Sequence, residues 1–296
     1  MRVAKQVRIC TVLTAVLAAP VCLAAQPGPF AIDQFAVTKT VRTANGPVQS
    51  TVIDDSFADG IPPPKGPDGA GGVYLIRGFP WPAASEVGGK LHFSPGGAVS
   101  SVDPEGRAFL TQRARLATST EQGASGGLRN NGVFSVSGVF DLAAPMGFGA
   151  GYGIGLTDSA DGELGNDALD LMVQRNQGDQ VVVQLARRDW QTHQTVLFQE
   201  FAVDFSQGDQ IKLALLKSDS ASNAINGFFQ YLDGGVAVGS PTAFNVAPVI
   251  FRGEDTTRAQ FQAVFVVPEP ETWLLFAAGL ATLAAVTRGR GGRSPA

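Results

Sequence analysis

The chain has 296 residues and a formal net charge of −4, and only 16% of its residues are charged, against ~25% in typical domains. It contains 36 glycines and 18 prolines, which suits many turns rather than long helices. Acidic chains are poor electrostatic partners for nucleic acid or anionic lipid, so we expect no nucleic-acid partner.

The first 24 residues have the three parts of a secretory signal peptide. A positive segment contains three basic residues, Arg2, Lys5 and Arg8. An apolar stretch follows over residues 9–19, and small residues precede a cleavage point before Ala25. This stretch would reach about 17 Å as a helix, short of a ~30 Å hydrocarbon core, so a cleaved signal is favoured over a membrane anchor.

The cysteines and the charges change once the terminal segments are set aside. Cys10 and Cys22, which are the two cysteines of the chain, both lie in the predicted signal peptide. Residues 25–267 therefore have no thiol for a disulfide, a metal site or a nucleophile. They contain 16 basic and 24 acidic side chains, a net charge of −8. A segment of this length can stabilise itself by burial as one domain.

Alternation of apolar and polar residues dominates this central segment and predicts strands. The expected strands begin near residues 73, 90, 109, 132, 168, 181, 195, 210, 228 and 260. Turn signals separate them, among them NQGDQ at 176, SQGDQ at 206 and the Asp-Gly of YLDGG at 231. No helical pattern of ten or more residues interrupts them. We therefore predict an antiparallel β-sandwich with about a dozen strands.

Three stretches give this segment a more specific likeness. They are DDSFADG at 54, YGIGLTDS at 152 and FFQYLDGG at 228. The pattern, over roughly residues 50–267, resembles the concanavalin A-like, or laminin G-like, jelly roll. The resemblance implies a fold that is often used for glycan binding, although a fold alone does not fix a function.

The stretch MGFGAGYGIGL raises a question about one sheet face. As a strand it would place five glycines on the same face, Gly147, Gly149, Gly151, Gly153 and Gly155. One interpretation is close approach of another segment, or relief of crowding where the sheet curves. The other is a shallow groove for a sugar ring, and there the candidate glycan-binding residues are Trp81, Trp190 and Tyr152.

The sequence shows no catalytic constellation. GASGG at 123 matches G-x-S-x-G, but its flanks are loop-like rather than a strand and a helix. Glu200 and Asp204 on one strand face would be about 13 Å apart, whereas glycoside cleavage needs carboxyls ~5–9.5 Å apart. Asp170 lacks the flanking glutamates of the jelly-roll glycanase signature E-x-D-x-x-E. We predict a noncatalytic protein. The alternatives are a glycan-active hydrolase or lyase, and a structural matrix protein without a ligand.

The stretch DSADGELGND is the one candidate metal site. Its possible Ca²⁺ ligands are Asp158, Asp161, Glu163, Asn166 and Asp167. The spacing departs from the EF-hand pattern, and the same residue types are common in turns. We expect turn chemistry and no cofactor, with Ca²⁺ as the open alternative.

The last segment, residues 268–296, reads as a membrane-directed tail. Pro268 and Pro270 bracket Glu269 and should end the strand-like run before them. An apolar run without charge follows over residues 274–286. Three arginines close the segment, Arg288, Arg290 and Arg293. A helix over about 273–287 would reach ~22 Å, short for a permanent span, and the positive-inside bias places the arginines in the cytoplasm.

The order of these parts resembles the PEP-CTERM sorting signal of Gram-negative bacteria. The residues that carry the resemblance are Val267, Pro268, Glu269, Pro270, Trp273, Arg288, Arg290 and Arg293. The family signal implies recognition by an exosortase, a membrane-embedded cysteine protease-like enzyme. It also implies transit through the inner membrane and delivery to the cell surface, typically in species that make exopolysaccharide. We therefore expect an exported, exopolysaccharide-associated protein, with glycan binding as its candidate activity.

Overall fold

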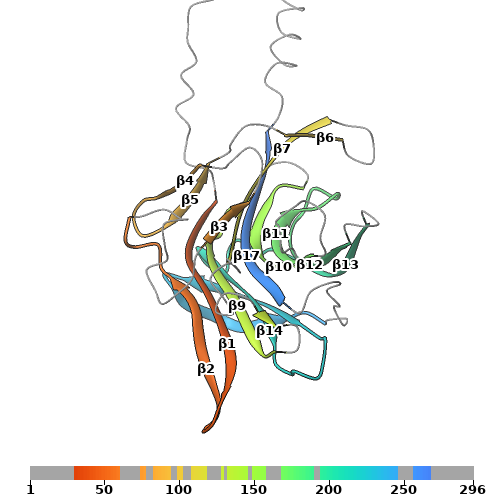
Figure 1. Ribbon diagram of the computed structural model, residues 1–296. Helices are drawn as coiled ribbons and strands as arrows, with labels where there is room; N and C mark the ends of the chain where they lie inside the picture. Colours follow the sequence, from red (N-terminus) through yellow and green to blue (C-terminus); the bar gives the residue numbers. More distant parts are fainter. Residues whose placement is uncertain are drawn as a thin grey trace, which may run out of the picture.

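The computed structural model describes residues 30–60, 74–77, 83–94, 99–102, 108–118, 128–129, 132–145, 149–157, 168–189, 194–245 and 256–267. These residues form 17 strands and no helix, arranged as two packed antiparallel sheets (Figure 1). Within them there is no helix with the length and hydrophobicity that a bilayer crossing requires. The predicted signal segment 1–24 and the predicted helix 273–287 lie outside the described residues.

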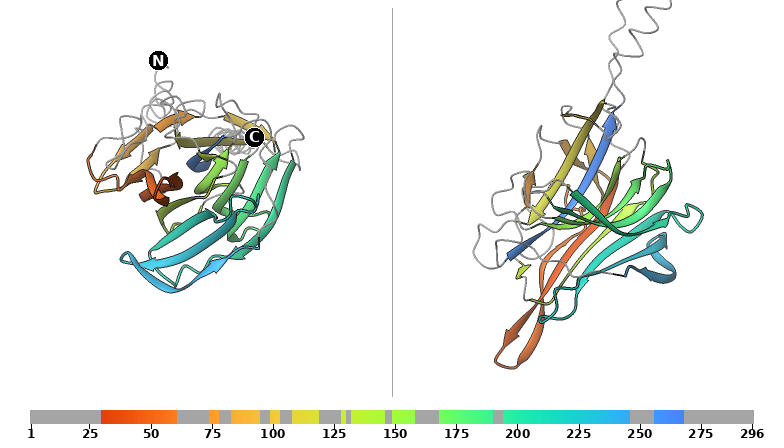
Figure 2. Two further views of the ribbon diagram at one scale, coloured as in Figure 1. Left: turned by 60° about the horizontal axis from the view of Figure 1, so that its bottom comes forward. Right: turned by 90° about the vertical axis from the view of Figure 1, so that its right-hand side faces the viewer.

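The first sheet has eight strands in the order β16-β15-β14-β9-β1-β5-β4, with β2 paired to β1. Their bounds are β1 Ala31–Thr43, β2 Gly46–Asp55, β4 Ala83–Glu86, β5 Leu91–Ser94, β9 Phe134–Asp141, β14 Gln210–Lys217, β15 Asn226–Asp233 and β16 Val236–Ala243. The hairpin of β1 and β2 extends beyond the sandwich as an arm (Figures 1 and 2).

The second sheet has nine strands in the order β13-β12-β11-β10-β17-β7-β3, with β6 paired to β7 and β8 paired to β17. Their bounds are β3 Tyr74–Arg77, β6 Val99–Val102, β7 Ala108–Thr118, β8 Leu128–Arg129, β10 Gly151–Thr157, β11 Ala168–Arg175, β12 Val181–Asp189, β13 Gln194–Ala202 and β17 Thr256–Val267. The two sheets confirm the predicted antiparallel β-sandwich.

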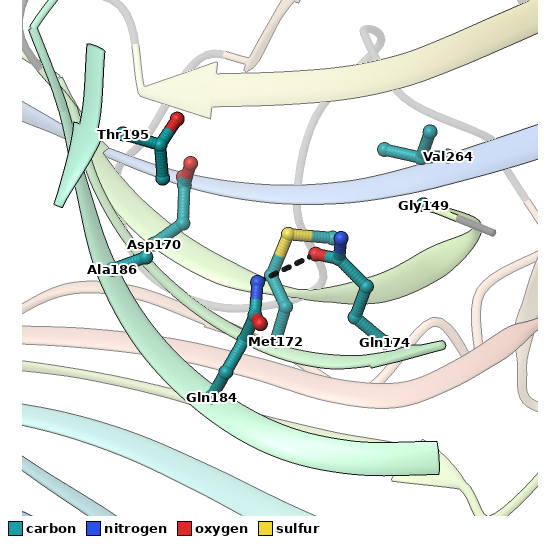
Figure 3. A pocket seen from close by; sticks show the side chains of 8 residues that line it. All are labelled: Gly149, Asp170, Met172, Gln174, Gln184, Ala186, Thr195 and Val264. Atoms are coloured by element: carbon teal, nitrogen blue, oxygen red, sulfur yellow. Dashed lines mark hydrogen bonds between the residues drawn. The ribbon is translucent and has the colours of Figure 1, made fainter. Parts of the chain in front are cut away.

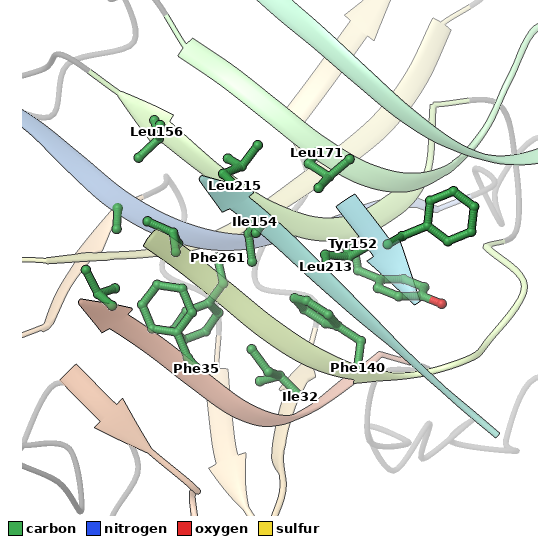
Figure 4. Packing of buried hydrophobic residues seen from close by; sticks show 14 of the residues in the cluster. Ile32, Phe35, Phe140, Tyr152, Ile154, Leu156, Leu171, Leu213, Leu215 and Phe261 are labelled. Atoms are coloured by element: carbon green, nitrogen blue, oxygen red, sulfur yellow. The ribbon is translucent and has the colours of Figure 1, made fainter. Parts of the chain in front are cut away.

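The core lies between the two sheets and follows from the period of two in each strand. Buried and partly exposed positions alternate along the whole of β9, and the buried ones face the second sheet. Phe261 on β17 is the centre of one aromatic group (Figure 4). Its ring centroid lies 4.8 Å from that of Phe35, 5.7 Å from that of Phe93 and 5.9 Å from that of Phe57. These tilted and edge contacts are the geometries that aromatic pairs prefer.

Tyr152 on β10 belongs to this core, so its assignment as a glycan-stacking residue is wrong. Its side chain is 1% exposed, and its ring centroid lies 4.9 Å from that of Phe30 and 5.4 Å from that of Phe140. The hydroxyl donates to the carbonyl of Ala143 and accepts from its N–H, both at 3.1 Å. The face opposite the glycines is therefore the core face, and Tyr152 has no surface to offer a sugar ring.

The glycines of β10 stand where the neighbouring backbone comes very close. A Cβ on Gly153 would lie 2.2 Å from the carbonyl oxygen of Leu171, and a Cβ on Gly151 would lie 2.4 Å from that of Val173. The interpretation as close approach of another segment is thus confirmed. Contrary to the expectation, the five glycines do not all lie on one strand face. Gly149 lies in the turn before β10, where its φ is +80°. Gly147 lies outside the described residues.

We predict that Gly153→Ala destabilises the protein by about 1–3 kcal/mol, because the atoms that the new methyl group meets are backbone atoms of β11. The midpoint of thermal unfolding should fall by roughly 2–4 °C per kcal/mol. Gly178→Ala is the matched control, since a Cβ there would meet only the side-chain oxygen of Asn176, at 3.3 Å. Equal midpoints for the two variants would contradict the close approach.

Tyr152 also predicts a pH dependence of stability. Burial raises the pKa of its phenol above the ordinary 10.0, while the hydrogen bond with Ala143 opposes that shift. The unfolded chain releases this proton near pH 10 and the folded chain does not. The stabilising contribution is therefore fully present below pH 10 and is lost as the pH rises above it.

The measurement is urea unfolding of the wild type and of Tyr152→Phe at about pH 7 and about pH 11. At neutral pH the variant should be less stable by about 1–2 kcal/mol, because two hydrogen bonds are lost. At alkaline pH the difference should shrink, since only the wild type carries the phenol at position 152. Tyr231, whose pKa burial also raises, is present in both proteins and cancels. A difference that does not change with pH would refute the prediction.

Candidate functional site

The second sheet presents one face to the core and curls around a cavity on the other. Leu169, Leu171 and Val173 of β11 belong to the core, so the residues between them lie on the outer face. Thr195 of β13 and Val264 of β17 line the same cavity, although three strands lie between these two strands. Only a sheet that is concave on its outer face brings them together, and the curvature of β10 to β12 is visible in Figure 1. We call this outer face the concave face.

A polar network crosses the bare strand β10 on the concave face. In the register, Gly155 lies between Asp170 on β11 and Gln260 on β17. β11 and β17 both pair with β10, so they are separated by ~9.6 Å. A side chain on the intervening strand would normally block a direct contact between residues on these two strands. Because Gly155 has none, the carboxylate Oδ1 of Asp170 accepts from Gln260 Nε2 at 3.2 Å and from Gln262 Nε2 at 2.7 Å.

The network is buried. Asp170 is 4% exposed, and Gln260 and Gln262 are fully buried. A buried carboxylate is stable only when donors satisfy it, and the two amides provide them. With its N–H group directed at Asp170, Gln260 has its carbonyl oxygen turned away. That oxygen has no hydrogen-bond donor among the described residues. The network therefore holds an acceptor that a hydroxyl or N–H group could satisfy.

The cavity beside this network has a volume of about 190 Å³. Its polar lining comes from Asp170, Gln174, Gln184 and Thr195. Its apolar lining comes from Met172, Ala186 and Val264, next to Gly149. Gln184 Nε2 donates to Gln174 Oε1 at 2.8 Å across the cavity wall (Figure 3). The lining thus offers both donors and acceptors, with a small apolar surface beside them.

The structure describes only part of the predicted site residues. Trp81 and Trp190 lie outside the described residues, as do all five candidate Ca²⁺ ligands from Asp158 to Asp167. Within the described part of the chain, no group of three or more His, Cys, Asp or Glu side chains is placed to hold a metal ion. Of the sorting residues, Val267 ends β17, and those from Pro268 onward are not described.

Glu200 and Asp204 do not share a strand face, so that expectation is wrong. β13 ends at Ala202, and Asp204 lies in the turn that follows. Its Oδ1 accepts from the hydroxyl of Ser206 at 2.7 Å and from the backbone N–H of the same residue at 3.0 Å. These hydrogen bonds lower the pKa of the Asp204 carboxyl. Asp204 therefore shapes a turn.

Sequence analysis missed the glutamines of the site. Alternation along β17 marks Phe261 and Ala263 as core residues, which leaves Gln260 and Gln262 on the opposite face. That signal was present in the sequence. What the sequence did not contain is the pairing that places these glutamines opposite the glycines of β10 and within reach of Asp170.

Comparison with known proteins identifies the tail. Residues 266–290 match the PEP-CTERM protein-sorting motif, which confirms the expected signal. No curated protein matches the chain. A solved structure of the carbohydrate esterase vb_24B_21 from the Shiga toxin-encoding bacteriophage phi24B aligns over 66% of this chain and 90% of its own, at 13% identity and a TM-score of 0.24. A TM-score this low shows neither a shared fold nor a shared activity.

The motif implies export, sorting during transit through a membrane and processing by an exosortase. The chain is therefore an antiparallel β-sandwich that carries a PEP-CTERM sorting motif at residues 266–290.

Proposed function

We propose that the protein is a noncatalytic, exported surface protein of a Gram-negative bacterium, and that it binds extracellular polysaccharide on the concave face of its second sheet. The sorting motif supports the exported location. The cavity beside Asp170 supports the binding, and it is the single observation on which the proposal rests.

The chemistry of the cavity suits a sugar. Sugar hydroxyl groups both donate and accept hydrogen bonds, and the Gln174–Gln184 amide pair offers both kinds of group. Asp170 lines the same cavity, and Gln260 and Gln262 hold its carboxylate in one position. Met172, Val264 and Ala186 can contact the C–H faces of a ring. The volume is below the ~300–1,000 Å³ of drug-sized ligand pockets, so we infer one sugar unit in the cavity, with the polymer extending along the concave face.

The charge of the lining supports binding rather than cleavage. Canonical glycoside hydrolysis uses two carboxyl groups that flank the scissile bond. Asp170 is the one carboxylate among the described residues that line the cavity. We therefore propose a binding role for it, and we retain Trp81 and Trp190 as candidate stacking residues.

The double variant Gln174→Ala/Gln184→Ala should bind polysaccharide about tenfold more weakly, because losing the amide hydrogen bonds costs roughly 1–1.5 kcal/mol. Affinity electrophoresis in gels that contain bacterial exopolysaccharides measures this, after a glycan array has chosen the polymers. Gln49→Ala is the matched control, since Gln49 is exposed on β2 and makes one side-chain hydrogen bond there, to Thr38 at 3.0 Å.

Two outcomes would overturn the proposal. Unchanged retardation of the Gln174→Ala/Gln184→Ala variant, with its thermal unfolding also unchanged, would remove the binding site from the cavity. Release of reducing sugar or of unsaturated products from the same polymers by the wild type, lost on Asp170→Asn, would replace binding with catalysis.

The sorting part of the proposal predicts an effect of the Pro-Glu-Pro motif. Pro268→Ala/Glu269→Ala/Pro270→Ala should leave the full-length chain in the inner-membrane fraction of a host that has an exosortase. The wild type should reach the cell surface there as a shorter species. Fractionation and intact-mass measurement distinguish these fates. Pro62→Ala/Pro63→Ala is the control with the same loss of two prolines, and mislocalisation of both variants would count against a specific motif.

A further inference from the structure

The arm formed by β1 and β2 projects past the last strand that supports it. The backbone N–H of Thr40 donates to the carbonyl of Val133 at 2.8 Å, and beyond this point β1 pairs with β2 alone among the described strands. Residues 41–48 therefore form a two-stranded ribbon that reaches about 13 Å beyond the sandwich (Figures 1 and 2). Val41 and Val48 are opposite one another there, 40% and 50% exposed. A two-stranded ribbon alone is marginally stable in water, so a contact would stabilise the arm.

The arm is basic, whereas the body from which it projects is acidic. Residues 38–51 contain two cations, Lys39 and Arg42, and no acid. The remainder of residues 25–267 contains 14 basic and 24 acidic side chains. Arg42 is exposed and makes no hydrogen bond or ion pair within the described part of the chain. The arm therefore presents positive charge beside exposed valines.

Acidic side chains gather where three other strands begin or end. Asp204 follows β13, Asp209 precedes β14, and Asp233 is the last residue of β15. The backbone N–H of Asp204 donates to the Tyr231 hydroxyl at 2.9 Å, and Asp209 Oδ1 accepts from the N–H of Gly234 at 3.0 Å. These hydrogen bonds hold the three exposed aspartates at one end of the sandwich.

This end of the molecule has the opposite charge to the arm and a comparable apolar surface. Residues 203–210 and 231–236, which we call the acidic end, contain the three aspartates and no cation. Lys212 lies just beyond on β14 and leaves a local net charge of −2. Phe205 and Val236 are 43% and 70% exposed there. The acidic end therefore matches the arm in both charge and hydrophobicity.

The arm and the acidic end of one molecule cannot meet. Gln210, at the start of β14, donates to Asp33 near the start of β1, so the acidic end lies beside the first residues of β1. The arm lies at the far end of the same strand. From Asp33 to Thr43 the strand extends roughly 33 Å. Any contact between these two surfaces is therefore a contact between two molecules.

We propose that the arm of one copy docks on the acidic end of a second copy, so that the protein associates head to tail. The cations of the arm face the aspartates, and the exposed valines contact Phe205 and Val236. Each contact leaves one arm and one acidic end free, so the association continues into rings or open filaments. Exposed ion pairs are individually weak, so assembly needs a high local protein concentration.

The observations favour a second copy over two other occupants of the arm. Two arms that paired with each other would bring four cations together with no acid between them, and like charges oppose pairing. An anionic polymer would meet only two cations on the arm, beside valines that it would leave exposed. The acidic end provides partners for both kinds of side chain.

The test is sedimentation of the complete chain in density-matched detergent over about a hundredfold range of protein concentration. The mean mass should rise with concentration past that of a dimer. Association should weaken at least about tenfold as salt rises from about 50 to 500 mM. Lys39→Glu/Arg42→Glu should weaken it at least about tenfold at low salt, because the charges of the arm are reversed. Arg42→Glu alone makes the same test, with a smaller loss, should the double variant fail to fold.

A charge exchange locates the contact. Asp233→Lys reverses the charge of the acidic end and should also weaken association. An equimolar mixture of the Asp233→Lys and Lys39→Glu/Arg42→Glu chains should associate at least about tenfold more strongly than either variant alone, because each contact then joins opposite charges. Asp54→Lys is the matched control, since Asp54 is exposed on β2 outside both surfaces, and it should associate like the wild type.

Four outcomes would overturn the inference. They are a wild type that stays monomeric at every concentration, a mass that stops at a dimer and is unchanged by Asp233→Lys, no gain on mixing the two variants, and an equal loss in Asp54→Lys. Dextran sulfate that binds the monomeric wild type but not the arm variant would assign the arm to an anionic polymer instead. The assay contains no glycan, so failure of the proposed polysaccharide binding would leave this inference standing.

Discussion

The glycines on one face of β10 are the constraint on which the rest of the second sheet depends, because they leave that face of the strand without side chains. The carbonyl oxygens of β11 occupy the space that Cβ atoms on Gly151 and Gly153 would need. This crowding on one face is what a sheet curled toward that face requires, and the curl brings β13 and β17 to the walls of one cavity. Because the glycines have no side chains, the Asp170 carboxylate can also reach across β10 and accept hydrogen bonds from Gln260 and Gln262. Curvature, cavity and polar network therefore share one cause in the sequence.

Strands that alternate between the core and the opposite face could be predicted, whereas the exposed arm and the edge strand β16 could not. β9 and β17 alternate between the core and the other side, and their periodicity is visible in the sequence. The arm formed by β1 and β2 leaves the sandwich, so its outer part has no buried face, and Val41 and Val48 are exposed there. β16 is an edge strand with mostly exposed positions, interrupted by Gly239 and Pro241. Neither shows the signal on which strand prediction depends.

The site was less predictable than the fold. It depends on which strands pair and on which face of each strand meets the core, and neither property is set by the local sequence alone. Tyr152 was correctly separated from the glycines, but a period of two cannot say which of the two faces meets the core. The glutamines of β17 become part of the site only because the strand pairing places them beside β10 and within reach of Asp170 on β11.

The sorting motif and the concave face are joined through a single strand. β17 lies between β10 and β7 in the sheet, lines the cavity with Val264 and remains paired to β7 as far as Val267. The motif begins at residue 266, so its first two residues are part of the sheet ladder, and Pro268 follows at once. Proline cannot donate to a ladder, which makes the end of the strand and the start of the tail the same point. The motif to which an exosortase would bind therefore begins at the end of an interior strand of the second sheet. Since no spacer separates the ladder from the motif, the point from which the tail leaves is fixed relative to the concave face.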